Sequence, residues 1–483
     1  MSLPSSSQPS TRSVAPWRQD PQHDGSLWST FWRALSPSQL FVGSFLLMIA
    51  AGTVGFKVLP GLYTGPPLNW LDALFTATSA ICVTGLIVVD TATYFTTWGQ
   101  AYVLLLIQLG GLGIIAFTSL IIVVLGRRMS LRQETLTSGA AGIVEEIDYR
   151  ELTWAIFRFT VLAELLGAVL LYVCWGPQLG WTGAVWPSVF HSISAFCNAG
   201  FSTFSTSLMG FQSNLPLLMV VMALIVVGGL GFLTLEELYV WRRVYREKER
   251  FRLSVHSQLV LGTTVLLIVG GWVAFTAFEW DSTLAGMSWG ERLVNGLFAS
   301  ITPRTAGFNS IDYAQMETET SVLTLIYMMI GGSPGSTAGG VKTTTFAILG
   351  LLAWSRLHGK PTTSISGRTL PESTVQKAMS LFIVAISIVA LGIFVFSTTE
   401  IPHTMPAADA PFLSYVFEAV SAFNTVGLSM GATGALTEAG RITTILLMFI
   451  GRVGTLTFVA AMAREPKRIA GGFRYAHEDV AIG

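Results

Sequence analysis

Long stretches without a single charged residue divide this sequence, and they restrict its possible folds more than any other feature. The charge-free windows are residues 34–56, 91–126, 165–235, 253–278, 320–341 and 378–399, with residues 442–463 interrupted only by Arg452. A helix needs about 20 apolar residues to cross a membrane, and each window is at least that long. Charged residues make up 12% of the chain, about half of the roughly 25% that is usual in soluble domains. The sequence therefore predicts an all-α integral membrane protein.

The placement of charge supports eight spans with both chain ends in the cytosol. We predict spans near residues 38–58, 96–125, 157–176, 214–239, 256–278, 320–352, 377–398 and 441–463. In this topology 22 of the 28 Lys and Arg residues fall in the tails and the inner loops, as the positive-inside rule requires. The outer loops carry an acidic excess, which would concentrate cations at a pore mouth but also suits ordinary solvated loops. Only the span over residues 320–352 is expected to be strongly broken.

A fourfold internal repeat organises the chain between its two tails. Each copy contains a semi-apolar segment, too short to cross a membrane, that ends in a glycine followed by Leu or Phe: Gly85, Gly200, Gly307 and Gly427. A second glycine marker follows in each copy, beginning at Gly110, Gly228, Gly331 and Gly451. Two markers in register four times indicate tandem repeats. The predicted units are a disordered cytosolic tail (1–37), repeats at 38–126, 127–241, 242–356 and 357–463, and a cytosolic C-terminal tail (464–483).

Each repeat is expected to form a span, a re-entrant pore helix, an extended strand and a second span. Non-helical backbone at membrane depth is tolerated only when it is buried in protein or lines a water-filled cavity. Four such strands can meet on one axis, which gives a single central pore with pseudo-fourfold symmetry. The C-terminus of a short helix favours a nearby cation, and strand carbonyls can replace the hydration shell of K⁺. Glycines of the second marker fit either close helix packing or the pore itself.

The predicted selectivity filter consists of three residues from each strand, whose backbone carbonyls would bind K⁺. These residues are Val83, Thr84 and Gly85; Asn198, Ala199 and Gly200; Thr305, Ala306 and Gly307; and Thr425, Val426 and Gly427. Arg304, inside the third segment, either braces nearby carbonyls or extends to the outer surface. The basic run 242–252 is either a solvated inner loop or a docking contact for a partner protein.

The four glycine-centred strands, the run Gly331-Gly-Ser-Pro-Gly-Ser-Thr-Ala-Gly-Gly-Val-Lys-Thr-Thr and the ending Arg474-Tyr…Gly483 resemble the Trk/Ktr/HKT superfamily of potassium transporters. The similarity covers nearly everything after residue 37 and is greatest with KtrB-type membrane subunits, because residues 1–37 cannot supply the additional pair of spans of Trk-type subunits. The resemblance implies a homodimer in the plasma membrane, with one pore per chain that conducts K⁺ and, as a second candidate, Na⁺. It also implies a cytosolic ring of KtrA-type subunits that binds the regulatory nucleotide, so that this chain holds no cofactor of its own.

The same resemblance implies an intramembrane gate below the filter, in the glycine-rich part of the sixth span. Its predicted residues are Gly331, Gly332, Ser333, Pro334, Gly335, Ser336, Thr337, Ala338, Gly339, Gly340 and Lys342, together with Arg452. Arg452 stands where the other repeats have glycine, and a charged residue within a span marks a functional site by default. A glycine-kinked helix and a purely structural arginine remain alternatives. A phosphate-binding loop requires Lys directly after its second glycine. Here Val341 separates Lys342 from Gly340, so we expect no ATP hydrolysis.

Two other classes of protein are alternatives to a channel-like transporter. An ion-coupled secondary transporter with alternating access would show inverted or two-half repeats, whereas this chain has four parallel ones. An intramembrane enzyme would need paired carboxylates or a His–acid set at membrane depth, and only Glu164 and Arg452 come near. We therefore predict no catalytic residue, no metal other than transported K⁺ and no nucleic-acid partner.

Overall fold

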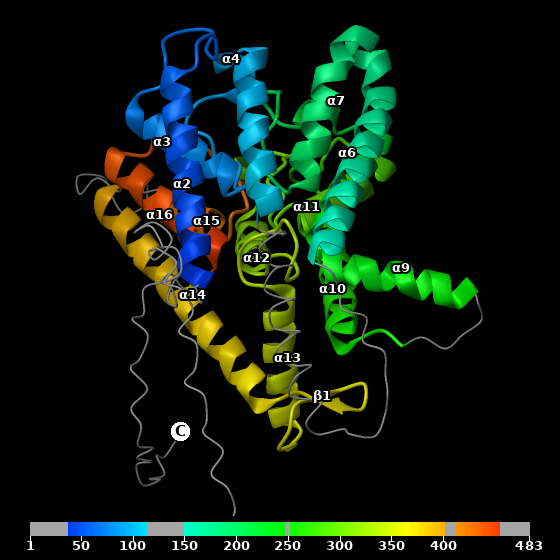
Figure 1. Cartoon of the computed structure of the whole chain (residues 1–483). Coiled ribbons are helices and arrows are strands. Elements are labelled where there is room, and N and C mark those ends of the chain that lie inside the picture. Colours follow the sequence, from blue (N-terminus) through cyan, green and yellow to red (C-terminus); the bar gives the residue numbers. More distant parts are fainter. Residues whose placement is uncertain (1–36, 114–148, 247–251, 401–411, 455–483) are drawn as a thin grey trace, which may run out of the picture.

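The computed structural model describes residues 37–113, 149–246, 252–400 and 412–454. This part of the chain is almost entirely helical (Figure 1). Its only sheet is an antiparallel pair of two-residue strands, β1 (Ser364–Ile365) and β2 (Arg368–Thr369). The predicted tails lie outside the described residues, except for Pro37, and so do the ends of the predicted spans 96–125 and 441–463 beyond residues 113 and 454.

Four helices among the described residues are long and apolar enough to cross a membrane alone. They are α2 (Pro37–Val58), α6 (Tyr149–Leu179), α10 (Val255–Phe278) and α14 (Glu372–Thr399). Each coincides with the predicted first span of a repeat. Their outer surfaces expose large apolar side chains, such as Leu47 (70% exposed), Leu162 (67%) and Leu266 (68%). Such exposure is expected of helices whose solvent is the lipid hydrocarbon.

A short helix follows each long one and packs against it. These are α3 (Trp70–Ile81), α7 (Trp181–Phe196), α11 (Trp289–Ile301) and α15 (Phe412–Phe423). Asn69 caps the first by accepting a hydrogen bond from the Asp72 amide (2.7 Å), and Ser288 and Glu291 form a capping box at the start of the third. Caps of this kind satisfy the free amides of a helix start and fix where it begins.

The chain then returns in a further helix, which leads to the second glycine marker. These helices are residues 97–113, which are helical up to the edge of the described part, α8 (Leu215–Gly229), α12 (Thr318–Met329) and α16 (Glu438–Val453). Two of them resume after a break, as α9 (Phe232–Arg246) and α13 (Thr343–Leu357). The remaining short elements are α4 (Thr91–Tyr94) and three turns of 3₁₀ helix, η1 (Met209–Phe211), η2 (Tyr313–Gln315) and η3 (Thr433–Ala435).

The prediction that only the sixth span is strongly broken was wrong, because α8 and α9 are bent by 101° where span 214–239 was expected. Gly231 has φ +83°, the left-handed conformation that typically ends helices at glycine. The carbonyls left free by this ending are used: Gly229 accepts a hydrogen bond from the Ser333 amide (3.0 Å) and Gly228 one from the Thr337 amide (3.3 Å). The breaks in the fourth and sixth spans therefore provide hydrogen-bond partners for each other.

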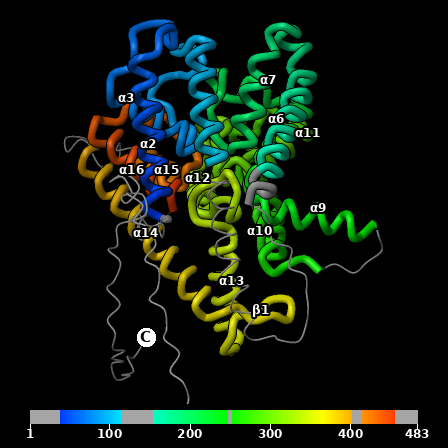
Figure 2. Tube along the Cα trace, in the orientation of Figure 1, coloured from blue at the N-terminus to red at the C-terminus, as the bar shows by residue number. Residues whose placement is uncertain are grey.

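The four groups of helices follow one another around a common centre, and the last returns to the first. Helix α16 packs against both α3 and α2, and Figure 2 shows the red end of the described chain beside its blue beginning. A salt bridge between Arg441 Nη1 and Asp72 Oδ1 (2.6 Å) joins the two helix starts at this closure. The short helices pack into the interior of the bundle, where their Phe75, Phe190, Phe298 and Phe417 side chains are buried.

Candidate functional site

The four strands that follow the short helices share an unusual backbone. Each has positive φ at the glycine and also two residues before it, at Val83 (+54°), Asn198 (+58°), Thr305 (+77°) and Thr425 (+50°). Left-handed conformations are uncommon for residues other than glycine and are costly for β-branched ones. Strained residues of this kind persist where the surroundings fix them and cluster at functional sites. The same strain at the same place in four strands indicates one shared structure.

The glycines of the four strands form a closed ring. The α-carbon of each faces the carbonyl oxygen of the middle residue in the next strand: Gly85 faces Ala199, Gly200 faces Ala306, Gly307 faces Val426 and Gly427 faces Thr84. A Cβ on Gly200 would lie 2.9 Å from the Ala306 oxygen and 3.0 Å from the Gly307 α-carbon. No side chain fits at these four positions without displacing the backbone of the next strand, so the ring itself is built from backbone atoms.

A hydroxyl at the end of each short helix holds the strand that follows. Ser79 donates to the Leu86 carbonyl (2.7 Å), Ser194 to the Phe201 carbonyl (2.8 Å) and Thr302 to the Phe308 carbonyl (2.7 Å). In the fourth strand Ser421 instead accepts from the Gly427 amide (3.1 Å).

The third segment differs from the others in the turn before its glycine. Thr302 lies five residues before Gly307, whereas Ser79, Ser194 and Ser421 lie six residues before their glycines. Thr302 and buried Phe298 nevertheless take the places of the Ser and Phe of the other segments.

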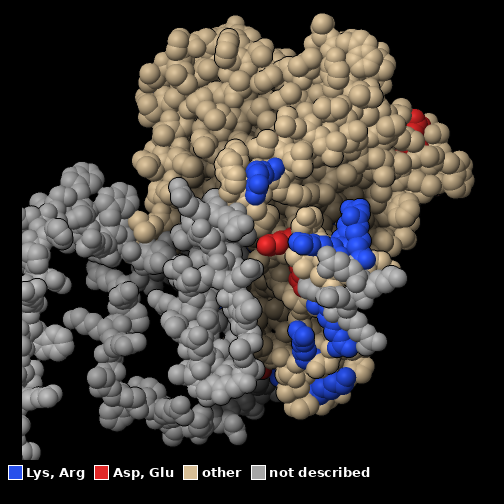
Figure 3. Space-filling model, turned by 45° about the vertical axis from the view of Figure 1, so that its right-hand side comes forward, with Lys and Arg blue, Asp and Glu red and all other residues tan. Residues whose placement is uncertain are grey.

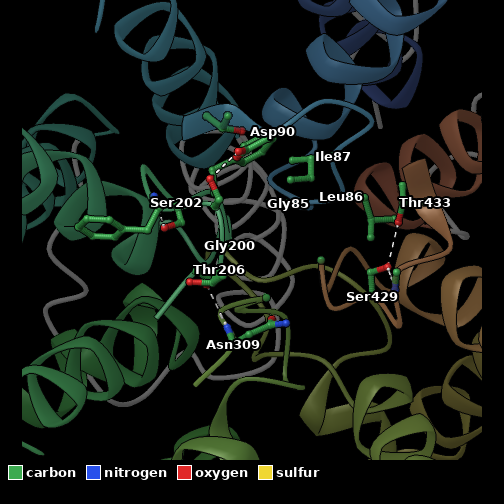
Figure 4. Close-up of a pocket in the computed structure, with 18 of the residues that line it drawn as sticks. Gly85, Leu86, Ile87, Asp90, Gly200, Ser202, Thr206, Asn309, Ser429 and Thr433 are labelled. Carbon is green, nitrogen blue, oxygen red and sulfur yellow. Dashed lines mark hydrogen bonds between the residues drawn. The ribbon is translucent and has the colours of Figure 1, made fainter. Parts of the chain in front are cut away.

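A cavity of about 510 Å³ opens on one side of the glycine ring. All four ring glycines line it, together with the carboxylates Asp90 and Asp312 and polar residues such as Ser202, Asn309 and Ser429 (Figure 4). Asp90 also accepts a hydrogen bond from Ser205 (2.5 Å), which joins the first and second repeats at the cavity wall. A cavity that carries acidic groups and ends at backbone carbonyls is suited to attract and dehydrate a cation.

The break between α12 and α13 lies on the other side of the ring. Residues 331–342 form no regular helix there. Thr337 accepts a hydrogen bond from Asn198 Nδ2 (2.8 Å), and its own hydroxyl faces the carbonyls of Phe196 and Gly228, each 3.1 Å away. Gly340 (φ +66°) approaches Asn424 so closely that a Cβ would lie 2.8 Å from its Oδ1. The segment therefore contacts the second and fourth strands directly.

Three cationic side chains lie at this segment. Arg452 is only 3% exposed; its Nη1 donates to the Thr337 carbonyl and its Nη2 to the Gly110 carbonyl (3.1 Å). Lys342 Nζ donates to the Ala338 carbonyl within the segment (2.7 Å). Arg304 lines a cavity of about 20 Å³ with Gly229 and Gly332, at the level of the segment and not at the outer surface.

The structure thus brings the predicted filter and gate residues together as two adjoining layers. Sequence reasoning missed the groups that join the layers, namely the carbonyls of Phe196 and Gly228 and the amide of Asn424. The sequence alone also left open whether the glycines of the second marker serve close helix packing. Gly110, Gly228 and Gly451 each lie against the carbonyl of the last residue of a short helix, Ile81, Phe196 and Phe423 respectively, with no room for a Cβ. The signal available in the sequence was their recurrence 24 to 28 residues after the glycines of the four strands.

The family of the chain follows from comparison with known sequences. The model of the TrkH family, described as cation transport protein, matches residues 34–468. The chain belongs to the TrkH family. This confirms the resemblance seen in the glycine-centred strands and the prediction that the chain is a transport protein and not an enzyme.

Two relatives in the TrkH family cover nearly the whole chain. The potassium/sodium uptake protein NtpJ of Enterococcus hirae is 39% identical over 93% of this chain and 98% of its own length. The Ktr system potassium uptake protein B of Bacillus subtilis is 38% identical over 94% and 98%. Among solved structures, TrkH of Vibrio parahaemolyticus superposes with a TM-score of 0.69 at 19% identity, over 92% of this chain and 87% of that one. The last comparison shows a shared fold.

Proposed function

We propose that this chain takes up K⁺, with Na⁺ as a second permeant ion, through a channel-like pore along the axis of the glycine ring. The closed ring of four glycines carries this proposal, because each glycine faces a carbonyl oxygen of the next strand and leaves no room for a side chain there. Carbonyls so placed can replace the hydration shell of a monovalent cation. The names of the two relatives, which are potassium or potassium/sodium uptake proteins, agree with this ion class.

The filter in this proposal consists of the three residues of each strand that end at the ring glycine, and the cavity with Asp90 and Asp312 is its outer vestibule. The first and second helices of each repeat span the membrane, and the short helices are re-entrant pore helices. Eight spans then place both termini in the cytosol, in a plasma membrane. Figure 3 supports this orientation, because most Lys and Arg residues visible on that face lie in its lower half, away from the vestibule.

The gate is the segment 331–342, which lies across the axis directly beyond the filter. Its hydrogen bonds with Asn198, Phe196 and Gly228 hold it there. Arg452 adds a donor to the Thr337 carbonyl and a positive charge beside the path of a cation. Opening requires these contacts to break together, as in a two-state element.

The proposed assembly is a homodimer on a cytosolic ring of KtrA-type subunits, and the regulatory nucleotide binds to the ring. The relatives named as Ktr system proteins support an assembly of several components.

An ion-flux assay on purified protein in liposomes tests the proposed function. K⁺ and Rb⁺ should enter passively, down their own gradients, and faster than Na⁺, while added ring subunits change the rate. Flux that requires a proton or sodium gradient would replace the channel with an ion-coupled transporter. Empty liposomes and protein with Gly85→Ser serve as controls for leak and for the filter.

A further inference from the structure

Helix α9 is the one described helix whose last two turns leave the body of the protein. It begins at the break after Gly231 and runs at 101° to α8, so it crosses the direction of the spans and projects sideways in Figure 1. Its first turns are anchored beside α10, where Glu237 accepts a hydrogen bond from the Ser254 hydroxyl (2.7 Å). A helix that turns through a right angle after an apolar span lies along the membrane surface.

The exposed turns of α9 combine aromatic and cationic side chains. Tyr239 is 72% exposed, Tyr245 70% and Trp241 40%, and Arg242 and Arg246 are exposed on the same turns. Aromatic rings with a polar edge are enriched at the headgroup level of membranes. In-plane helices use this combination, with apolar rings directed into the bilayer boundary and arginines toward phosphate groups.

A cavity of about 440 Å³ continues this surface where α9 approaches the β1–β2 hairpin. Trp241, Arg252 and Arg368 line it, together with Leu253, Gln258 and Ser366. Ser366 donates to Gln258 Oε1 (2.7 Å), which fixes the polar wall. None of the described residues that line this cavity is a carboxylate. Two guanidinium groups beside an indole suit a phosphate with an apolar tail, and basic pockets on the cytosolic side of spans bind lipid headgroups in this way.

The N-terminus of α9 is hydrogen-bonded to the proposed gate. The Phe232 amide donates to the Gly335 carbonyl (3.1 Å), and Gly231 lies against the Pro334 carbonyl with no room for a larger residue. The position of α9 and the conformation of residues 331–342 are therefore parts of one arrangement. A ligand that binds α9 in this position stabilises the gate in the same state.

We infer that α9 and the adjoining cavity bind anionic phospholipid of the inner leaflet, and that this binding favours the closed gate. The second half of the inference rests on the proposed function, whereas lipid binding itself does not. The occupant is a lipid because the exposed turns combine phosphate-binding arginines with interfacial aromatic residues along the plane of the membrane. A free phosphate would leave these aromatic residues without an apolar partner.

The test compares the parent with the double variant Arg242→Gln/Arg246→Gln, and with Lys360→Gln/Lys377→Gln as a control. The control also removes two exposed positive charges, at residues that belong neither to α9 nor to the lining of the cavity. Phosphatidylglycerol retained by each purified protein is counted by native mass spectrometry. K⁺ flux is measured without ring subunits in vesicles of phosphatidylcholine alone, and in vesicles with a quarter phosphatidylglycerol.

We expect the parent and the control to retain phosphatidylglycerol and to conduct several-fold more slowly in the anionic vesicles. The α9 variant should retain less lipid and lose most of that difference. Equal lipid retention by parent and α9 variant would overturn the inference. Lipid loss without any change in flux would remove only the link to the gate. Equal retention combined with weaker ring binding would assign α9 to the ring instead. If no protein conducts K⁺ at all, the proposed function fails, while the retention measurement still decides the lipid site.

Discussion

Asn198 donates a hydrogen bond from Nδ2 to the hydroxyl of Thr337, 2.8 Å away and 139 positions later in the chain. The first residue lies in the second filter strand and the other in the segment beyond it. The equivalent residues of the other strands, Val83, Thr305 and Thr425, have no amide that could make this contact. The ring of glycines is fourfold, but its connection to the segment is not: the fourth strand packs against Gly339 and Gly340, whereas the second strand donates a side-chain hydrogen bond to Thr337.

Replacing Thr337 by Val should open the gate more often. The two side chains have nearly the same shape, but valine neither accepts from Asn198 nor faces the carbonyls of Phe196 and Gly228 with a hydroxyl. A buried neutral hydrogen bond contributes about 1 kcal/mol net, and this difference corresponds to about a fivefold change in the open-to-closed ratio. K⁺ flux in liposomes without ring subunits should rise by about that factor.

The control for this change is Thr276→Val in α10, whose buried hydroxyl has no partner among the described residues. It should conduct like the parent. An unchanged flux in Thr337→Val, with normal yield and thermal stability, would show that this contact does not hold the segment.

Replacing Gly85 by Ser should weaken the discrimination between K⁺ and Na⁺. The residue has φ +94°, and its new Cβ would overlap the Ala199 carbonyl oxygen, so that oxygen must turn away from the axis. We expect a raised Na⁺/K⁺ permeability ratio, and the same in Gly200→Ser, Gly307→Ser and Gly427→Ser. Gly286→Ser is the matched control, because Gly286 has φ +82° but nothing within 4 Å of its Cβ position. Parent-like ratios in all four ring variants would disprove the filter.

Replacing Arg452 by Ala should speed K⁺ flux. The change removes the donors to the Thr337 and Gly110 carbonyls and a positive charge that repels cations on the axis. Arg452→Lys should be intermediate, since it keeps the charge without the planar fork of donors. Flux and dimer content should be measured together. Folded Arg452→Ala protein that conducts no faster would exclude a barrier role, and failure to assemble would identify a structural one.

Shortening the segment between Gly331 and Lys342 should also raise flux and reduce its dependence on the ring. Removal of Ser336–Gly339 deletes Thr337 and the close approach of Gly339 to Thr425, so less backbone lies across the axis. The rate should be compared with and without ring subunits. Equal rates in the shortened protein and the parent would mean that the segment is only an interruption between two helices.

Replacing Asp72 by Asn should lower stability slightly without altering selectivity. The Asp72 and Arg441 side chains are 15% and 21% exposed, and a pair so partly exposed contributes about 1 kcal/mol at most. This predicts a fall of about 1–2 °C in the midpoint of thermal unfolding. Glu438→Gln, which alters an exposed acid on the same helix as Arg441, should leave the midpoint unchanged. A large loss of K⁺ selectivity in Asp72→Asn would show that the pair also shapes the filter.

The four strands could be predicted from the sequence because glycine recurs in each repeat at the position where no side chain fits. No other residue fits at Gly85 and its three counterparts, so each of these positions requires glycine independently of the others. The contact between Asn198 and Thr337 could not be predicted, because it depends on one side chain in one repeat and on a segment far along the chain. The bend at Gly231 had a signal in the sequence, since a glycine at the end of an apolar run is a helix-stop signal. The absence of charge in a window, however, does not distinguish a straight span from a bent one.

The closure of the ring has a consequence for how the protein is made. The α-carbon of Gly427 faces the carbonyl of Thr84, and Arg441 bonds to Asp72, so the first-made strand finds one of its two neighbours only when the last repeat has emerged from the ribosome. In the proposed pore, its polar backbone would until then lie at membrane depth with one side unpaired, where lipid offers no hydrogen-bond partner. The membrane-insertion machinery would therefore have to cover an incomplete ring until the fourth repeat is made, and we expect a chain truncated before residue 427 to conduct no ions.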